Sequence, residues 1–210
     1  MKLAVVAASG KVGSKVVAEA ATRGIEVTAF VRRTAEINGA SKVIVKDILA
    51  LEKSDLENFD AVVDAFGAWT PETLPLHSTT LKHLCDLLSG SETRLLVVGG
   101  AGSLFVDKEH KTQLYQTPDF PPSYLPIATA QAKALAELRE RDDVKWTFIS
   151  PAADFRADGE KTGKYIFGGE EFILNAAGES VISYADYALA MVDELINGKN
   201  IRRRICVIKA

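Results

Sequence analysis

The sequence has few cysteines, little excess charge and no long hydrophobic run, and each shortage excludes a class of protein. Its two cysteines, Cys85 and Cys206, lie far apart and form no C-x-x-C pair, so we expect two buried thiols rather than a disulfide framework or a zinc site. A formal net charge of −3 gives no reason to expect a nucleic-acid partner or an anionic membrane. No apolar stretch is long enough to span a bilayer.

The N-terminal segment MKLAVVAASG has a lysine and a short apolar run, as a signal peptide does. The run is too short for that role and leads directly into a patterned helix. We therefore expect a cytoplasmic protein.

Histidine is also scarce, with three residues in the chain. His77 and His83 are six positions apart and do not share a helix face well, and no cluster of carboxylates and histidines accompanies them or His110. We expect no metal site and interpret the histidines as ordinary helix and loop residues.

Strand-like and helix-like segments alternate along almost the whole chain. Short strands separated by helices form βαβ units, so the pattern predicts an α/β fold of three layers, doubly wound around a parallel sheet. A length of 210 residues fits one domain over residues 1–210. The predicted strands are 2–6, 26–31, 42–45, 61–65, 94–98, 146–150 and 205–208, and the predicted helices are 12–23, 76–88, 128–140 and 183–195.

Two segments interrupt this alternation. Residues 104–126 contain four prolines and little periodicity, and a long irregular loop of this kind is usually functional or mobile. Residues 156–182 are rich in glycine and charge, with β-like pieces around Tyr165 and Phe172, and we expect a small C-terminal substrate lobe there. The next four residues, 183–186, resemble a capping box with aspartate in place of glutamate.

A glycine-containing loop, AASGKVG, follows the first strand and precedes the first helix. In dinucleotide-binding loops the second glycine lets the backbone approach a pyrophosphate, and the third lets the helix pack on the strand. Gly10 and Gly13 fill these two roles, while Ala7 replaces the first glycine and is tolerated if its φ is negative. Amide groups at the helix N-terminus favour an anion. The loop residues predicted to bind the cofactor are Ala7, Ser9, Gly10, Lys11, Val12 and Gly13.

The end of the second strand distinguishes two nicotinamide cofactors. Arg32 and Arg33 stand where an NAD-binding protein often has an acid for the ribose hydroxyls, and guanidinium groups suit a 2′-phosphate instead. We therefore favour NADP(H) over NAD(H), with two solvated arginines as the alternative. Because ligands lie at the carboxyl ends of strands, further cofactor contacts are expected from Asp47, Ile48, Ala65, Phe66 and Gly67.

These and later segments together resemble a known family, the atypical short-chain dehydrogenase/reductases of the NmrA-like and NADH-flavin-reductase-like group. The resemblance rests on AASGKVG, VVDAFG, LLVVGGAGSL, TPDFP, FISPAADF and TGKY, which are distributed over nearly the whole chain. It implies an extended NAD(P)-binding Rossmann fold and adds Gly99 to the expected cofactor contacts. Some members resemble biliverdin or flavin reductases, and others are nucleotide-sensing regulators.

The resemblance also directs attention to a missing catalytic tyrosine. Short-chain reductases use a Tyr-x-x-x-Lys pair, and the matching window here begins with Thr129 and ends with Lys133. Threonine is too weak an acid to replace the phenol, and Lys133 alone is equally interpretable as a solvated helix residue. Ser103 is near the family's catalytic serine, or is a turn residue.

We therefore expect an NADP(H)-dependent reductase, with FMN, FAD or another conjugated molecule as the hydride acceptor. A flavin accepts hydride and can take its proton from water, so it needs less from the protein than a carbonyl does. The main alternative is a non-catalytic protein that senses NADP(H). A sugar-nucleotide epimerase is disfavoured because that chemistry needs the tyrosine. We expect a monomer or a homodimer that acts on a small molecule.

Overall fold

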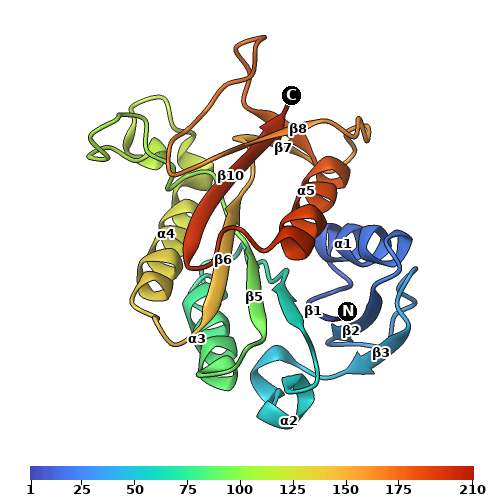
Figure 1. Cartoon of the computed structure of the whole chain (residues 1–210). Coiled ribbons are helices and arrows are strands. Elements are labelled where there is room, and N and C mark those ends of the chain that lie inside the picture. Colours follow the sequence, from blue (N-terminus) through green and yellow to red (C-terminus); the bar gives the residue numbers. More distant parts are fainter.

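An eight-stranded sheet forms the middle layer of the molecule in a computed structural model that describes residues 1–210 (Figure 1). Its strand order is β3-β2-β1-β4-β5-β6-β10-β8, and every neighbouring pair is parallel except β10 and β8. The doubly wound parallel fold is therefore confirmed. The strands are β1 (Lys2–Val6), β2 (Glu26–Val31), β3 (Lys42–Val45), β4 (Ala61–Asp64), β5 (Arg94–Val98), β6 (Lys145–Ser150), β8 (Tyr165–Gly168) and β10 (Arg203–Lys209).

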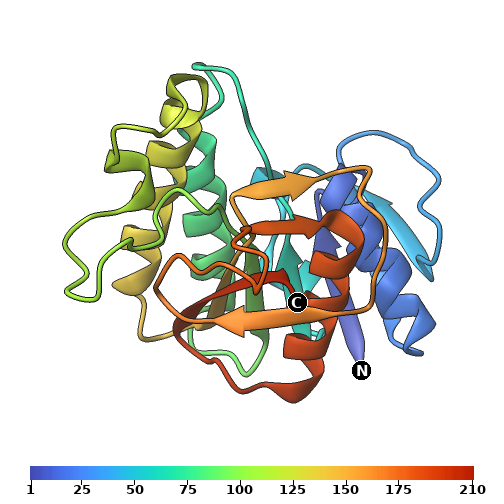
Figure 2. The ribbon, with the colours of Figure 1, turned by 90° about the horizontal axis from the view of Figure 1, so that it is seen from above.

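Helices cover both faces of this sheet (Figure 2). The helices α1 (Lys11–Thr22) and α5 (Tyr184–Asn197) pack on one face, and α3 (Leu76–Leu88) and α4 (Leu125–Arg139) pack on the other. Strands buried on both faces are expected to be apolar throughout, which explains the runs AVV and LLVV. None of the helices combines the length and the apolar composition needed to cross a membrane.

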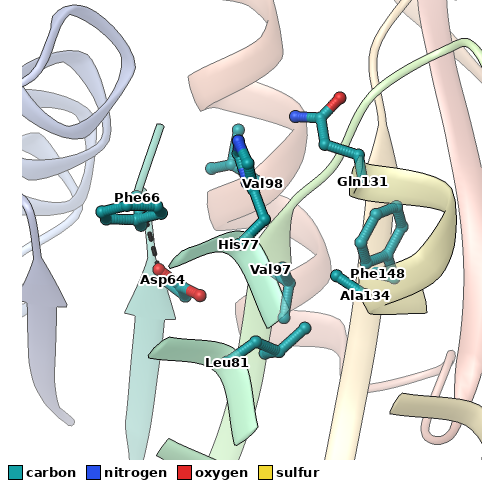
Figure 3. Close-up of a pocket in the computed structure, with 9 residues that line it drawn as sticks. All are labelled: Asp64, Phe66, His77, Leu81, Val97, Val98, Gln131, Ala134 and Phe148. Atoms are coloured by element: carbon teal, nitrogen blue, oxygen red, sulfur yellow. Dashed lines mark hydrogen bonds between the residues drawn. The ribbon is translucent and has the colours of Figure 1, made fainter. Parts of the chain in front are cut away.

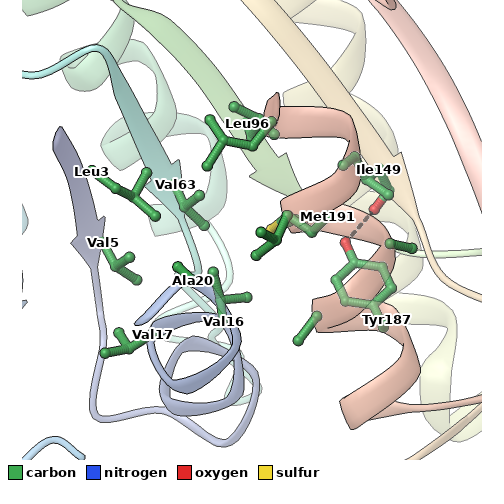
Figure 4. Close-up of a cluster of buried hydrophobic side chains, with 14 of the residues drawn as sticks. Leu3, Val5, Val16, Val17, Ala20, Val63, Leu96, Ile149, Tyr187 and Met191 are labelled. Carbon is green, nitrogen blue, oxygen red and sulfur yellow. Dashed lines mark hydrogen bonds between the residues drawn. The ribbon is translucent and has the colours of Figure 1, made fainter. Parts of the chain in front are cut away.

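Each helical layer has its own hydrophobic core. Under α3 and α4, Leu81 and Ala134 lie near Val97 and Phe148 of the sheet (Figure 3). On the other face, Val16 of α1 and Met191 of α5 pack near the strands (Figure 4). The buried hydroxyl of Tyr187 in α5 donates to the Ile149 carbonyl at 2.6 Å, which fixes α5 on β6.

The sequence pattern predicts the start of α4 three residues too late. The helix begins at Leu125 and includes Pro126, which the pattern assigns to the irregular loop. Proline is tolerated in the first helical turn because its missing N–H would have no intrahelical partner there. The short elements that the pattern did not predict are the 3₁₀ turns Ile48–Ala50, Leu114–Gln116 and Pro122–Tyr124, the helix α2 (Lys53–Leu56), and the strands β7 (Asp154–Arg156) and β9 (Val181–Ser183).

The segment 156–182, where a substrate lobe is expected, also contributes the strand β8 to the main sheet. β8 pairs with β10 as an antiparallel edge strand, and β7 pairs with β9. The predicted capping box is only half formed: Ser183 Oγ accepts from the Asp186 amide at 3.0 Å, but Asp186 does not bond back to the Ser183 amide. Its carboxylate instead accepts from the amides of Thr162 and Gly163, which ties the segment to α5.

Candidate functional site

The carboxyl ends of β1 and β4 lie side by side at the point where the strand order reverses. Chain connections leave in opposite directions there, so a crevice opens at the edge of the sheet, and ligands of open α/β sheets bind in such a crevice. The loop after β1 leads to α1, and the loop after β4 leads to α3 (Figure 1). These two loops form the centre of the candidate site.

The N-terminus of α1 has the properties of an anion-binding site. Gly10 is its N-cap residue and supplies no side-chain hydrogen bond, and the first turn contains no acidic residue. No oxygen of the protein accepts from the amides of Lys11, Val12 or Gly13. Unpaired amides at a helix N-terminus attract a phosphate group through both hydrogen bonding and the helix dipole. The loop therefore suits a pyrophosphate.

Gly10 and Gly13 serve different purposes in this loop. A Cβ at Gly13 would lie 2.7 Å from the Ala7 carbonyl oxygen and 3.3 Å from the Ala65 Cβ, so Gly13 allows α1 to pack against the loops after β1 and β4. Gly10 is exposed, and a Cβ there would meet the protein only at 3.2 Å, at the same carbonyl oxygen. Its outer side is left open for a ligand.

The condition under which alanine is easily tolerated at position 7, a negative φ, is not met. Ala7 has φ of 55°, in the left-handed region that favours glycine. The chain makes a tight turn here, in which the Gly10 amide donates to the Ala7 carbonyl at 2.9 Å. The loop thus keeps the geometry of the missing first glycine, and the alanine carries backbone strain in its place.

The residues predicted to contact the ribose and adenine follow β2 and β3, the strands next to β1. Arg32 and Arg33 are exposed, and neither forms an ion pair within the chain. Asp47 is exposed, but its Oδ1 accepts from the Leu49 amide at 2.9 Å and so caps a short turn. Ile48 is buried in the α3–α4 core. The arginines are thus available to a phosphate, while Asp47 and Ile48 also have structural roles.

A small cavity of about 10 Å³ lies between the carboxyl ends of β4 and β5 and the helices α3 and α4. This volume is near the lower limit for one water molecule. Figure 3 shows three polar side chains around it, one each from β4, α3 and α4. Its lining residues are Asp64, Phe66, His77, Leu81, Val97, Val98, Gln131, Ala134 and Phe148.

Asp64 is a buried carboxyl group with one hydrogen bond within the protein. Its Oδ1 accepts from the Phe66 amide at 3.0 Å, which shapes the loop after β4. Burial raises the pKa of Asp64 to about 6, and the Phe66 hydrogen bond opposes this only partly. A titratable group with a shifted pKa in a cavity at the carboxyl end of a strand marks a candidate functional site.

His77 holds the same loop from the other side. Its Nε2 lies 3.3 Å from the Ala68 amide nitrogen and 3.1 Å from the Ala68 carbonyl oxygen, and its ring packs edge-on against Phe66 at 5.4 Å. Burial lowers the pKa of His77, which favours the neutral imidazole. Our interpretation of His77 as an ordinary helix residue missed its place in the cavity.

Aromatic side chains gather at the carboxyl end of β6. Phe155 and Tyr184 pack with ring centroids 4.1 Å apart. Burial raises the pKa of Tyr184. Trp69, in the loop after β4, has 66% of its surface exposed. Flat apolar surfaces are thus available near both β4 and β6.

The geometry does not support the predicted catalytic roles of Thr129 and Lys133. Both are exposed on the outer face of α4: Thr129 Oγ1 donates to the Leu125 carbonyl at 2.8 Å, and Lys133 Nζ lies 3.8 Å from Glu137. The residue between them that faces the cavity is Gln131. Helical spacing explains this, because positions two apart point in different directions.

Ser103 and Gly99 also have structural surroundings. Ser103 is buried, and its Oγ accepts from Arg204 Nη1 at 3.4 Å, away from the cavity. Gly99 is buried, and a Cβ there would lie 2.2 Å from the Phe148 ring. Gly99 is therefore explained by close packing, and a catalytic role for Ser103 has no geometric support.

The sequence contained a signal for the cavity that spacing alone did not reveal. Asp64 ends the apolar run AVVD, and a carboxyl group at the end of a buried strand is unusual enough to be noticed. Gln131 had no comparable signal, since its side chain packs on Gly100, a contact between distant segments.

Comparisons with known proteins show the family of the chain. A family model described as NAD(P)H-binding matches residues 7–197. The crystal structure of SP1627 from Streptococcus pneumoniae, named as a candidate NADH-flavin reductase, is 53% identical, covers 100% of both chains and superposes with a TM-score of 0.98. A candidate epimerase from Bacteroides thetaiotaomicron is 34% identical over 99% of this chain and 96% of that chain, with a TM-score of 0.85. The uncharacterized protein YwnB of Bacillus subtilis is 46% identical over 99% of this chain and 98% of its own. The glycine loop at the β1–β4 switch point and these matches together show that the chain belongs to the NAD(P)H-binding family of Rossmann-fold proteins.

Proposed function

We propose that the protein is an NADPH-dependent reductase that passes hydride to a flavin or another flat conjugated acceptor. The observation that carries the proposal is the set of unpaired amides at the N-terminus of α1, beside the unpaired Arg32 and Arg33. The amides would hold the pyrophosphate, and the guanidinium groups would hold a 2′-phosphate through charge-assisted hydrogen bonds. The bound nicotinamide would supply the hydride.

The acceptor is proposed from the surfaces around the cavity. Phe66 and the exposed Trp69 follow β4. Phe155 follows β6 and packs on Tyr184 at the start of α5. Aromatic rings bind flat conjugated molecules by stacking and bury much apolar area at little entropic cost. A flavin between these two sides would be oriented by the protein, and orientation is the main contribution that hydride transfer to it requires.

Proton supply favours this acceptor over a carbonyl. A carbonyl reductase needs a proton donor beside the hydride donor, and a positioned general acid contributes about 10²–10⁴-fold in rate. No tyrosine occupies the Thr129–Lys133 window, and Lys133 is exposed. The missing phenol also argues against an epimerase. It is compatible with the second candidate, a protein that binds NADP(H) as a sensor without turnover.

The test is NADPH oxidation with a panel of FMN, riboflavin and quinones. We expect turnover with at least one flavin and a preference for NADPH over NADH. Replacing both arginines, Arg32→Gln with Arg33→Gln, should lower this preference about 10²–10⁴-fold, because two charge-assisted bonds are lost and each costs about 1.5–3 kcal/mol. A control pair, Lys42→Gln with Lys53→Gln, removes the same charge from the exposed surface and should preserve the preference.

Two outcomes would contradict this proposal. Equal affinity of the unmodified protein for NADPH and NADH would remove the role of the arginines. Tight NADPH binding without turnover of any acceptor would favour the sensor.

A further inference from the structure

A second polar cavity, which we name the arginine cavity, lies beside the C-terminal end of α4. It has a volume of about 270 Å³, and Trp146 is its one hydrophobic lining residue. Trp146 and Arg203 lie at the amino ends of β6 and β10, whereas the candidate nucleotide site lies at the carboxyl ends of the strands. The two sites are therefore distinct. The other lining residues are Arg139, Arg141, Asp142, Glu170, Arg202 and Arg204.

Positive charge exceeds negative charge in the arginine cavity. Arg141 is neutralised, because its guanidinium donates to both oxygens of Asp143, at 2.8 and 2.9 Å, and to Asp86 at 2.6 Å. The other four arginines of the lining are balanced by only two carboxylates, Asp142 and Glu170. A cleft lined mainly by charge of one sign concentrates the electric field and attracts ions of the opposite sign.

One of those carboxylates is shared between two arginines. Oε2 of Glu170 accepts from Arg139 Nη2 at 2.6 Å and from Arg204 Nε at 2.8 Å. The Arg204 side chain is fully buried and also donates to the Ser103 carbonyl at 3.2 Å. Glu170 can neutralise only one of the two guanidinium groups, so a positive charge remains at the base of the cavity.

The two arginines at the rim have no acidic partner. Arg203 is exposed and makes no hydrogen bond through its side chain, and Arg202 has a single long contact, from Nε to the Val144 carbonyl at 3.4 Å. Arg202 has φ of 55°, a conformation that residues other than glycine rarely adopt. Its amide is fixed to the Trp146 carbonyl at 2.6 Å, so this strained turn holds consecutive guanidinium groups at the cavity.

We propose that the arginine cavity binds a small oxyanion of the phosphate class with at least two negative charges. The planar guanidinium group can donate two parallel hydrogen bonds to two oxygens of a phosphate, and two such groups are free here. The volume is just below the roughly 300 Å³ at which small-molecule pockets begin, which suits a diphosphate or a small phosphate ester. Trp146 is 3% exposed and offers no open ring face to a nucleobase, so a nucleotide fits less well.

Tryptophan fluorescence can test this directly. The chain has two tryptophans, so Trp69→Phe leaves Trp146, beside the cavity, as the one reporter. Pyrophosphate would be titrated at constant ionic strength with saturating NADP⁺ present, because the α1 loop also attracts phosphate. We expect a saturable change with a midpoint below about 1 mM. Parallel titrations with inorganic phosphate and glycerol 3-phosphate distinguish an inorganic ion from a phosphate ester.

Charge-matched variants separate a built site from general surface attraction. Arg202→Gln with Arg203→Gln should weaken pyrophosphate binding at least tenfold, whereas Lys42→Gln with Lys53→Gln should change it less than twofold. The absence of a saturable change would overturn the proposal, as would equal weakening in the two pairs. Tighter binding of citrate than of pyrophosphate would refute the phosphate class.

Discussion

Replacing Gly13 by alanine should loosen the loop proposed to hold the nucleotide, whereas the same change at Gly10 should not. The added methyl group at Gly13 would lie 2.7 Å from the Ala7 oxygen and 3.0 Å from the Ala8 Cα. Both contacts are with backbone, so α1 must move away from β1, and overpacking of this kind costs about 1–3 kcal/mol. The higher helix propensity of alanine offsets about 1 kcal/mol of this cost relative to glycine.

The net effect expected for Gly13→Ala is a loss of about 1–2 kcal/mol, since backbone contacts place the overpacking near the upper end of its range. For a chain of this length each kcal/mol changes Tm by about 2–4 °C, so Tm should fall by about 2–8 °C. Gly10 has φ of −70° and ψ of 162°, which alanine adopts without strain. Gly10→Ala should therefore change stability little while placing a methyl group where the pyrophosphate would approach.

Thermal unfolding with and without NADPH, followed by calorimetric titration, separates the two glycines. Gly13→Ala should lower both Tm and NADPH affinity, and Gly10→Ala should lower mainly the affinity. An unchanged Tm together with full affinity in Gly13→Ala would refute the packing argument. Full affinity in Gly10→Val, which carries a larger side chain, would show that the loop is not the phosphate site.

Three other predictions concern the strained turn, the buried acid and the outer face of α4. Ala7→Gly removes the strain of a left-handed alanine, about 1–2 kcal/mol, but increases the conformational entropy of the unfolded chain, which costs about 0.4–1 kcal/mol. Tm should therefore stay equal or rise slightly. A clear fall in Tm would show that Ala7 is not strained. Folding raises the pKa of Asp64 from 3.8 to about 6. Between these pH values the folded protein keeps the proton on Asp64, whereas the unfolded chain releases it. The free energy of unfolding therefore falls as the pH rises across this interval. Asparagine does not titrate, so the stability of Asp64→Asn relative to the unmodified protein should increase by up to about 3 kcal/mol between pH 4 and pH 7, as measured by urea unfolding. A stability difference between the two proteins that does not change with pH would be inconsistent with a raised pKa at Asp64. Thr129→Val and Lys133→Ala should each change NADPH turnover less than about twofold. A thousandfold loss in either variant would show that this face of α4 takes part in the reaction.

Local patterns in the sequence were enough to predict most of the framework. The bounds of β1, β2, β3, β5 and α3 match the predicted ones, because apolar runs and helical spacing depend on neighbouring residues. The strand–loop–helix context of residues 7–13 was likewise readable from the sequence, and the structure has that arrangement between β1 and α1. The edge strand β8 was visible as a β-like piece around Tyr165, although its pairing with β10 was not.

Tertiary packing decided which side chains face the site. Asp64, His77 and Gln131 come from three different elements, and only the packing of α3 and α4 on the sheet brings them around one cavity. The same packing leaves Thr129 and Lys133 in solvent, although a motif window had suggested them. Sequence spacing fixes the direction of a side chain relative to its own helix. The rotation of that helix about its axis, and so the face that it turns to the sheet, depends on contacts between residues distant in sequence, such as Gln131 with Gly100.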